Sequence, residues 1–401
     1  MSVENLFKNF TFIDSVKNRP IICWGIYEIA EKTIKRMNKK VNCFIDNNPS
    51  SQNTVFLDLN VFSPSHLNSF KIKPFIIICT TSVNDVAKQL SELGYKESVD
   101  FVASPILNDL IKVLQLENLR AKVLFTSGAP KSKKKEVGGG IYELTIDKKI
   151  KLNKIFSNPC HSILKFNKNF IAVDQKKGLC EFDSKYNIIR TAKIPPGRRP
   201  HGIAYNQKKE EFFVNCSATD STLKLDKNLK IIEEFHFSEK FRKFEKPHHH
   251  LNDICFVNDS LYLSMFSYSG NFKNDCFDGV VCEIDVMTGE CMGVIKPDLW
   301  MPHTIKFFDD GLVVLDSLRG TLLKNNFSVS GTFPGFLRGL DYNGQFFFIG
   351  QSRNRAPSKK LGISNNISID SGIIIFDEES KLSRTIYLPP EIYEIHSLVI
   401  I

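Results

Sequence analysis

A short motif recurs six times between residue 161 and the end of the chain. It consists of a basic residue, a small or polar residue and then an apolar run, as in His303-Thr304-Ile305. The copies begin at His161, His201, His250, His303, Arg338 and His396. Their spacings of 40, 49, 53, 35 and 58 residues are irregular, which is typical of repeats whose loops vary while their strands do not. We therefore expect six similar units around a common axis.

Short segments rich in β-branched and aromatic residues accompany every motif. The expected second strands are residues 123–126, 170–174, 212–215, 261–264, 312–316 and 346–349. The expected third strands are residues 139–147, 178–183, 221–226, 279–285, 320–325 and 371–377, five of which end in the turn residue Asp. Weaker fourth strands are expected at 188–194 and 385–388. About four strands per unit predict a six-bladed β-propeller.

The two ends of the repeat region are complementary. The first unit, from about residue 121, has no opening strand, whereas the chain ends on an unpaired opening strand at 395–400. We expect this C-terminal strand to complete the first blade, because closure removes an open sheet edge. Loss of the last seven residues is then expected to unfold the ring.

The chain is too long for the propeller alone. Six blades from residue 119 leave the first 118 of 401 residues for another domain. We predict a Rossmann-like α/β domain over residues 1–102, a helical connector over 103–118 and the propeller over 119–401. The segments 20–24, 41–45 and 75–80 are the expected parallel strands of the first domain, with a helix after Gly25.

The N-terminal domain carries an incomplete nucleotide-binding pattern. Asp46 lies 21 residues after Gly25, near the offset of an acid that binds a ribose hydroxyl. Tyr27 stands where a glycine would let a pyrophosphate approach, so only weak nucleotide binding is expected. The alternative is that Gly25 forms a tight turn and Asp46 starts a loop. Residues 43–49 resemble the nucleotide-sugar-binding-like Rossmann modules attached to bacterial sugar-modifying enzymes.

Composition favours a soluble cytoplasmic protein. No apolar run approaches the roughly 18 residues needed to cross a membrane, and no signal peptide is evident at the start. The ten cysteines show no paired spacing, which is typical of buried thiols in a reducing compartment. The net charge of +9 is carried on loops without interleaved aromatic residues, so an anionic small molecule is expected as ligand rather than a nucleic acid.

The repeated basic residues should converge, because the first strand of each propeller blade is innermost. We expect them to form a ring at one mouth of the central channel. Neutral imidazoles suit a divalent transition metal such as Zn²⁺, Fe²⁺ or Mn²⁺. The predicted metal ligands are drawn from His161, His201, His250, His303 and His396. The alternative is a structural ring in which each histidine braces a turn.

Further residues are expected around the same mouth. Arg338 would hold an anionic group, and Tyr393 or Glu394 would transfer a proton. Basic loops would contribute to substrate binding through Arg198, Arg199, Arg353 and Arg355, with the lysines at 131–135, 273, 359 and 360. A merely solvated basic surface is the alternative for the lysines at 133–135.

Residues 199–203, 301–304, 314–320 and 336–341 resemble a bacterial conserved-hypothetical propeller family and, more loosely, six-bladed propellers of the NHL and gluconolactonase kind. The resemblance implies the fold and no particular activity. Two functions are expected from the site. One is a metal-dependent lyase, epimerase or hydrolase for a sugar phosphate, nucleotide sugar or uronate, in surface-polysaccharide biosynthesis. The other is a non-catalytic propeller that binds a glycan or a protein.

Overall fold

The chain forms two compact units, Met1–Glu117 and Asn118–Ile401, in the computed structural model. The structure describes residues 16, 18–37, 39–128, 138–274, 276–308, 311–353 and 367–401. Within these ranges, no helix is both long and apolar enough to cross a membrane. The ten cysteines are free thiols, and most are buried, as their positions in predicted strands indicated.

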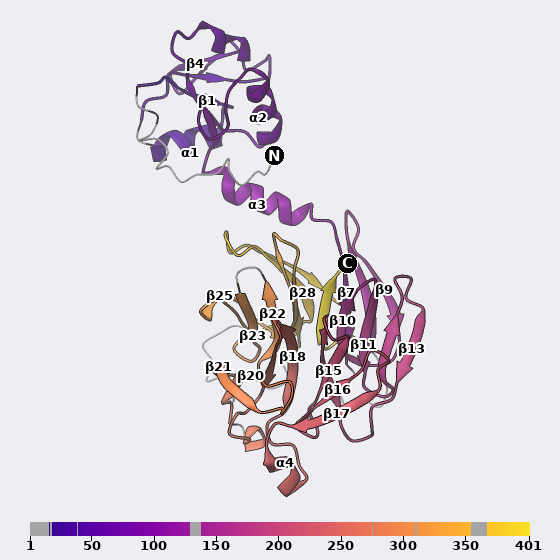
Figure 1. The fold of residues 1–401 in the computed structure, drawn as a ribbon. Helices are drawn as coiled ribbons and strands as arrows, with labels where there is room; N and C mark the ends of the chain where they lie inside the picture. The colour runs from indigo at the N-terminus through magenta and orange to yellow at the C-terminus, as the bar shows by residue number, and fades with distance from the viewer. Residues whose placement is uncertain are drawn as a thin grey trace. The chain divides into compact units, whose positions relative to one another are not determined.

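The N-terminal unit is built on a mixed sheet. In the described residues its strands lie in the order β3-β4-β2-β1-β5-β6 (Figure 1). The elements are β1 (Ile21–Trp24), α1 (Glu28–Met37), β2 (Cys43–Ile45), β3 (Val55–Phe56), β4 (Leu59–Phe62), η3 (Pro64–Ser69), β5 (Phe75–Ile78), α2 (Val83–Glu92), β6 (Phe101–Ala103) and α3 (Leu107–Glu117). The expected helical connector thus corresponds to α3.

Strand β1 is apolar throughout because both faces of the sheet are covered. Ile22 and Trp24 pack in one core cluster with α2, whereas Ile21 and Cys23 pack in the other with α1. Strands β2 and β5 pair with β1 in parallel, as predicted. The sheet is nevertheless mixed, because β3 joins β4 in an antiparallel hairpin. The finer expectation of a Rossmann-like fold stays a prediction.

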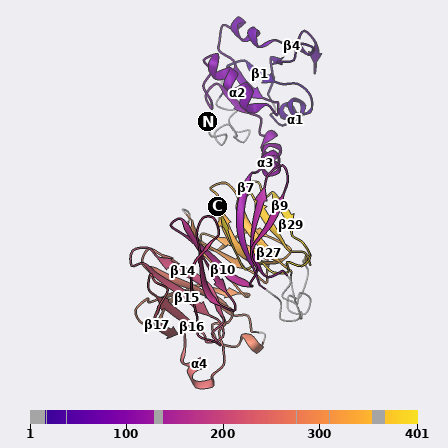
Figure 2. The same ribbon diagram turned by 90° about the vertical axis from the view of Figure 1, so that its right-hand side faces the viewer.

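The C-terminal unit is a six-bladed propeller. In the described residues its strands form six four-stranded antiparallel sheets (Figures 1 and 2). From the inner to the outer strand they are β10 (Cys160–Phe166), β11 (Asn169–Asp174), β12 (Gly178–Phe182) and β13 (Ile188–Ala192); β14 (Pro200–Asn206), β15 (Glu211–Cys216), β16 (Ser221–Leu225) and β17 (Ile231–His236); β18 (Leu251–Val257), β19 (Ser260–Met265), β20 (Gly279–Ile284) and β21 (Cys291–Leu299); β22 (His303–Phe308), β23 (Gly311–Asp316), β24 (Thr321–Lys324) and β25 (Ser328–Thr332); β26 (Phe336–Tyr342), β27 (Phe347–Ser352), β28 (Gly372–Phe376) and β29 (Ser383–Tyr387); and β30 (Ser397–Ile400), β7 (Ala121–Ser127), β8 (Gly140–Ile146) and β9 (Lys151–Phe156). Short helices α4 (Glu239–Phe244) and η4 (Phe272–Asn274) lie in two connections.

The last blade joins both ends of the propeller. Strand β30 pairs antiparallel with β7, with Leu398 opposite Phe125 and Ile400 opposite Val123. The predicted completion of the first blade by the C-terminal strand is therefore confirmed. Leu398 and Phe125 are both fully buried, so the closure is held by core packing as well as by backbone hydrogen bonds.

Candidate functional site

A β-bulge interrupts the start of five inner strands, β10, β14, β18, β22 and β26. Beyond each bulge regular pairing resumes at or just before a buried aliphatic residue, as at Ile203 and Ile305. We aligned the six inner strands on this buried aliphatic residue. In every strand, the residue two positions before it lies at the channel mouth. The residues there are His161, His201, Asn252, His303, Arg338 and His396. We call this set the channel ring.

His250 does not occupy this position of the inner strand, although its ring centroid lies 5.6 Å from that of His201. Asn252 occupies that position, and its Nδ2 donates to the Pro302 carbonyl at 2.8 Å. His161 makes the same bond to the next blade, from Nδ1 to the Pro200 carbonyl at 2.8 Å. His250 lies before β18 and its ring stacks on Phe266, with centroids 4.2 Å apart. The sequence pattern was aligned on histidine, whereas the bulge sets the register.

Three imidazoles of the channel ring lie together. The ring centroid of His161 is 4.0 Å from that of His201 and 4.7 Å from that of His396, and the last two are 6.0 Å apart. These three histidine rings are therefore neighbours, and the expected convergence of their nitrogen atoms on one point stays a prediction. Burial, reinforced by neighbouring imidazole and guanidinium groups, holds the pKa of His161, His201 and His303 well below its usual range. These imidazoles are neutral at pH 7.

Arg338 links the other side of the channel ring. Its Nε donates to His303 Nε2 at 3.1 Å, and its Nη1 donates to Glu394 Oε2 at 3.4 Å. His396 Nε2 donates to the same carboxylate oxygen at 3.0 Å. The guanidinium carbon lies 4.6 Å from the centroid of the Phe336 ring. The structure thus brings two predicted catalytic residues, Arg338 and Glu394, into one buried network.

The histidines differ in their remaining hydrogen-bonding capacity. His303 donates from Nδ1 to the Met301 carbonyl at 2.9 Å and accepts from Arg338 at Nε2, so both nitrogens are engaged. His161 Nε2 lies against the Gln175 amide. In contrast, His201 Nε2 is buried and has no hydrogen-bond partner among the described residues. A buried nitrogen without a partner indicates room for a ligand.

A cavity of about 10 Å³ lies at this point, which is about the space of one water molecule. Its lining residues are His161, Ser162, His201, Gly202, Asn252, Asp253, His303 and His396. In the described part of the chain, no three His, Cys, Asp or Glu residues are placed to hold a metal ion. The rings of His161 and His201 are stacked 16° from parallel, so their in-plane lone pairs do not meet at one point.

The predicted arginines have different surroundings. Arg199 is exposed, and its charge adds to the effects of burial and the other imidazoles that lower the pKa of His201. Arg198 instead pairs with Glu234 at 2.7 Å, which ties it to β17. Arg353 is exposed and its guanidinium lies 5.5 Å from the Tyr393 ring. Arg355 and the predicted lysines at 131–135, 359 and 360 lie outside the described residues.

The N-terminal site residues support the simpler alternative. Asp46 follows β2 at the carboxyl end of that strand, as predicted, but its Oδ1 accepts the backbone N–H of Asn48 at 2.8 Å, as in a loop-starting turn. Tyr27 is exposed and has a positive φ of 80°. Gly25 has a φ of 104°, and a Cβ there would lie 2.8 Å from the Cys79 carbonyl. Gly25 is therefore required by the turn itself.

A second repeated position, immediately after the channel ring, escaped the sequence analysis. It holds Ser162, Gly202, Asp253, Thr304, Gly339 and Ser397. Asp253 is the one acid in this set, and burial raises its pKa to about 6. The signal was available in the sequence, because these residues are all small or hydroxylated except Asp253. Gln175 was also missed, and no sequence pattern marks it.

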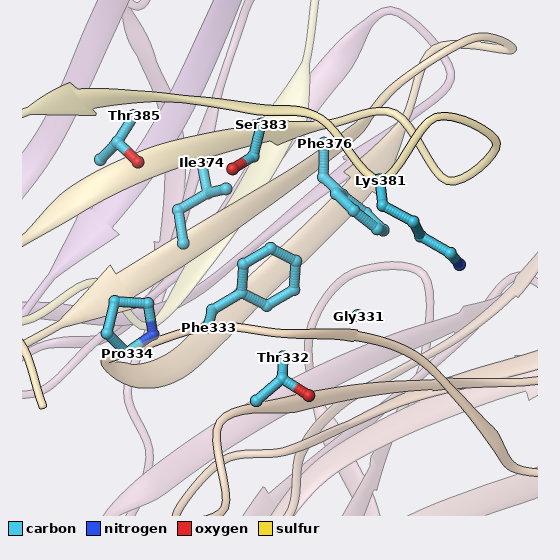
Figure 3. Close-up of a pocket in the computed structure, with 9 residues that line it drawn as sticks. All are labelled: Gly331, Thr332, Phe333, Pro334, Ile374, Phe376, Lys381, Ser383 and Thr385. Atoms are coloured by element: carbon cyan, nitrogen blue, oxygen red, sulfur yellow. The ribbon is translucent and has the colours of Figure 1, made fainter. Parts of the chain in front are cut away.

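A separate pocket of about 280 Å³ lies at the rim of the propeller, between the blades that end in β25 and β29. It is lined by Gly331, Thr332, Phe333, Pro334, Ile374, Phe376, Lys381, Ser383 and Thr385, and Figure 3 shows Lys381 extending away from Phe333. Among these lining residues Lys381 is the one titratable group, and its Nζ donates to the Ser330 carbonyl at 2.8 Å. The rim pocket therefore offers no acid–base pair, unlike the channel.

Solved structures similar to this chain share its propeller at low sequence identity. A protein of unknown function from Bacteroides caccae matches 71% of this chain and 99% of its own, with 12% identity and a TM-score of 0.50. A chain of a nidogen/laminin complex matches 70% of this chain and 98% of its own, with 11% identity and a TM-score of 0.48. A gluconolactonase-like protein matches 58% of this chain and 78% of its own, with 14% identity and a TM-score of 0.42.

The likeness to the Bacteroides caccae protein supports the propeller fold alone, and no curated protein matches the chain. Among protein families, residues 17–99 match the model described as C2185-like, N-terminal. Residues 124–401 match the model described as a domain of unknown function, DUF4915. Since this match spans the whole propeller and more than half of the chain, the protein belongs to the DUF4915 family.

Proposed function

We propose that the propeller is an enzyme that acts on an anionic carbohydrate at the channel ring. The observation that carries this proposal is the buried network in which Arg338 and His396 share the Glu394 carboxylate. Burial of such an ion pair costs solvation free energy, so a packed apolar core would favour replacing it. A guanidinium that can hold an anion, beside a carboxylate and an imidazole, supplies the groups for proton transfer.

The substrate classes that fit are a sugar phosphate, a nucleotide sugar or a uronate. Each carries the anionic group that Arg338 would hold, with Arg199 as a second cation beside the channel ring. The cavity of about 10 Å³ is too small for a sugar ring. The sugar would therefore lie outside the channel ring and would present one group to it. Glu394 and His396 would then move the proton in lyase, epimerase or hydrolase chemistry.

The divalent transition metal stays part of the proposal. His161, His201 and His396 would hold it only after the stacked rings of His161 and His201 turn so that their lone pairs meet, and the partnerless Nε2 of His201 supports this choice. Such a metal would polarise a carbonyl group or activate water when bound. His303 is the weaker candidate because Arg338 already donates to its Nε2. The bonds of His161 with Gln175 and of His396 with Glu394 compete with metal binding.

The ligand proposal is tested with full-length protein and a panel of sugar phosphates, nucleotide sugars and uronates, measured by thermal shift and then by calorimetry. At least one class should bind, and Arg338→Gln should weaken it about tenfold or more, since a charge-assisted bond contributes roughly 1.5–3 kcal/mol. Arg190→Gln, which removes an arginine paired with Glu181 elsewhere, should leave binding unchanged. Absence of binding by the whole panel would overturn the proposal.

The metal is tested separately by metal analysis of untagged protein, with and without incubation in Zn²⁺, Mn²⁺ or Fe²⁺. Near-stoichiometric metal that is lost in His201→Ala supports the histidine site. Protein that retains none after incubation contradicts it without affecting the carbohydrate proposal.

A non-catalytic propeller that binds a glycan or a protein is the second candidate. It is favoured by the bonds from His161 and Asn252 to carbonyl groups of the next blade, which brace the ring as structural residues would. Carbohydrate binding without turnover, unchanged by Glu394→Gln, would identify this function.

A further inference from the structure

The opposite half of the central channel contains a second, larger cavity of about 300 Å³. It is lined by the inner strands β10, β14, β18, β22 and β30. The residues of the second repeated position that line it are Ser162, Asp253, Thr304 and Ser397. Asp253 also lines the small cavity at the channel ring, so this layer separates the two cavities. We call it the channel floor.

Asp253 is placed at the channel floor by its neighbours. A Cβ on Gly202 would lie 2.7 Å from Asp253 Oδ1, so the glycine makes room for the carboxylate. Thr304 Oγ1 accepts the N–H of Gly339 at 2.9 Å, and the Thr304 hydroxyl donates to Asp253. Among the described residues that line the larger cavity, Asp253 is the one acid. Its Oδ1 also accepts the N–H of Ile254 at 3.1 Å, and the charge of Lys306 partly opposes the effect of burial on its pKa.

Ser397 contributes a hydroxyl acceptor to the same cavity. Ser397 Oγ donates its proton to the Ile163 carbonyl at 3.3 Å, which leaves its lone pairs for a donor. Ser162 adds a second hydroxyl at the same level. A carboxylate beside accepting oxygens suits a ligand group that carries one positive charge and several N–H donors. The volume of the cavity is far greater than a bare ion needs and suits a small organic molecule.

Two lysines line the same cavity, but they are not equivalent. Lys306 is paired with Asp341 at 2.9 Å, so its charge is already balanced. Lys165 lies three residues beyond Ser162 on β10, which corresponds to about 10 Å along a strand. Lys165 also lines this cavity and is exposed, so its flexible side chain can turn toward an anionic group of a ligand there.

We infer that this cavity is a second ligand site, which binds a small zwitterion with its primary ammonium group on Asp253 and its carboxylate or phosphate at Lys165. The site does not depend on the proposed function, because Arg338, Glu394 and His396 do not line this cavity. It lies on the other side of the channel floor from the channel ring.

The test uses 6-aminohexanoate, a zwitterion with a primary ammonium group and a carboxylate, together with hexanoate and hexylamine, each of which lacks one charge. Calorimetry on the full-length protein should show that the zwitterion binds at least about tenfold more tightly than either analogue. Asp253→Asn should remove the advantage over hexanoate, and Lys165→Met the advantage over hexylamine. Asp259→Asn, an exposed acid on the same blade, is the matched control.

Equal affinities for the three probes, no binding of any probe, or unchanged binding in Asp253→Asn would each overturn the inference. The Arg338→Gln variant separates the two sites, because it should bind 6-aminohexanoate as the wild type does while it loses the anionic carbohydrate. Loss of both ligands in that variant would contradict two independent sites. Thermal melts confirm that each variant is folded before binding is compared.

Discussion

His201 and His303 occupy equivalent positions in the channel ring, but the hydrogen-bond partners of their Nε2 atoms differ. His303 is held on both sides, by the Met301 carbonyl and by Arg338. His201 Nε2 is buried without a partner in the described residues. The same residue type at the same repeated position is therefore part of a bonding network in one blade and available to a ligand in another.

Asp253 gives a pH-dependent prediction at the residue scale. Burial raises its pKa in the folded state to about 6, whereas an unfolded Asp titrates near 3.9. The folded protein therefore binds the Asp253 proton more tightly than the unfolded chain does. The contribution of this group to the free energy of unfolding is present below about pH 4 and is lost as pH rises through 6. Asp253→Asn should raise the free energy of unfolding by about 2 kcal/mol at pH 7.5 and change it little at pH 4. Urea unfolding at both values measures this.

An unchanged or lower stability of Asp253→Asn at pH 7.5 would show that the carboxylate is compensated in the fold. A stabilising substitution that also removes zwitterion binding would show that Asp253 serves a ligand at a cost in stability.

The channel histidines give a prediction of opposite sign. Burial holds the pKa of His161, His201 and His303 well below the unfolded value of about 6.5. Their contribution to the free energy of unfolding is present above pH 6.5. It is lost as pH falls below 6.5, by about 1.4 kcal/mol for each histidine and each pH unit. The urea midpoint should therefore fall between pH 7 and 5.5, and His303→Gln should reduce that fall. If the urea midpoint of the variant falls by the same amount, the pH dependence comes from other groups.

At the scale of single elements, the turn between β1 and α1 is strained. Tyr27 has a φ of 80° and an exposed fraction of 66%, so its side chain gains little burial while its backbone occupies a region that favours glycine. Tyr27→Gly should stabilise the N-terminal unit by about 1 kcal/mol, whereas Tyr27→Ala, which keeps the strain, should not. Chemical unfolding followed by Trp24 fluorescence in a Trp300→Phe background reports on this unit.

A decrease in stability for Tyr27→Gly would indicate that the aromatic contact with Phe56, at a centroid distance of 6.4 Å, matters more than the strain.

Weak NAD binding by wild-type protein is also expected, and micromolar affinity by calorimetry would contradict it.

At the scale of the whole molecule, the propeller depends on the pairing of β30 with β7. Deletion of residues 395–401 removes this pairing and should unfold the ring, because both the open edge and the apolar face of β7 become exposed. Deletion of the partly exposed Ile401 alone is the control. A synthetic peptide of residues 393–401 should restore the melting transition of the truncated protein. A truncated protein that melts as the wild type does would contradict ring closure by this strand.

The sequence by itself determined the number of blades, the pairing of the two ends and the position of Asp46 after β2. These follow from periodicity in hydrophobic residues and from a missing first strand, which are local features of the chain. Four of the five histidines were correctly assigned to the channel ring for the same reason.

Only the tertiary structure decided that Asn252 replaces His250 in the channel ring, because a bulge of β18 fixes the register and no residue pattern records it. It also decided which nitrogen of each histidine is occupied, since the contacts of Gln175 with His161 and of Glu394 with His396 depend on side-chain geometry that no residue pattern records. The second cavity was likewise hidden, because Asp253 and Lys165 lie on different blades and line one cavity only in the folded ring. Local patterns specify strands, whereas a site depends on contacts between strands distant in the chain.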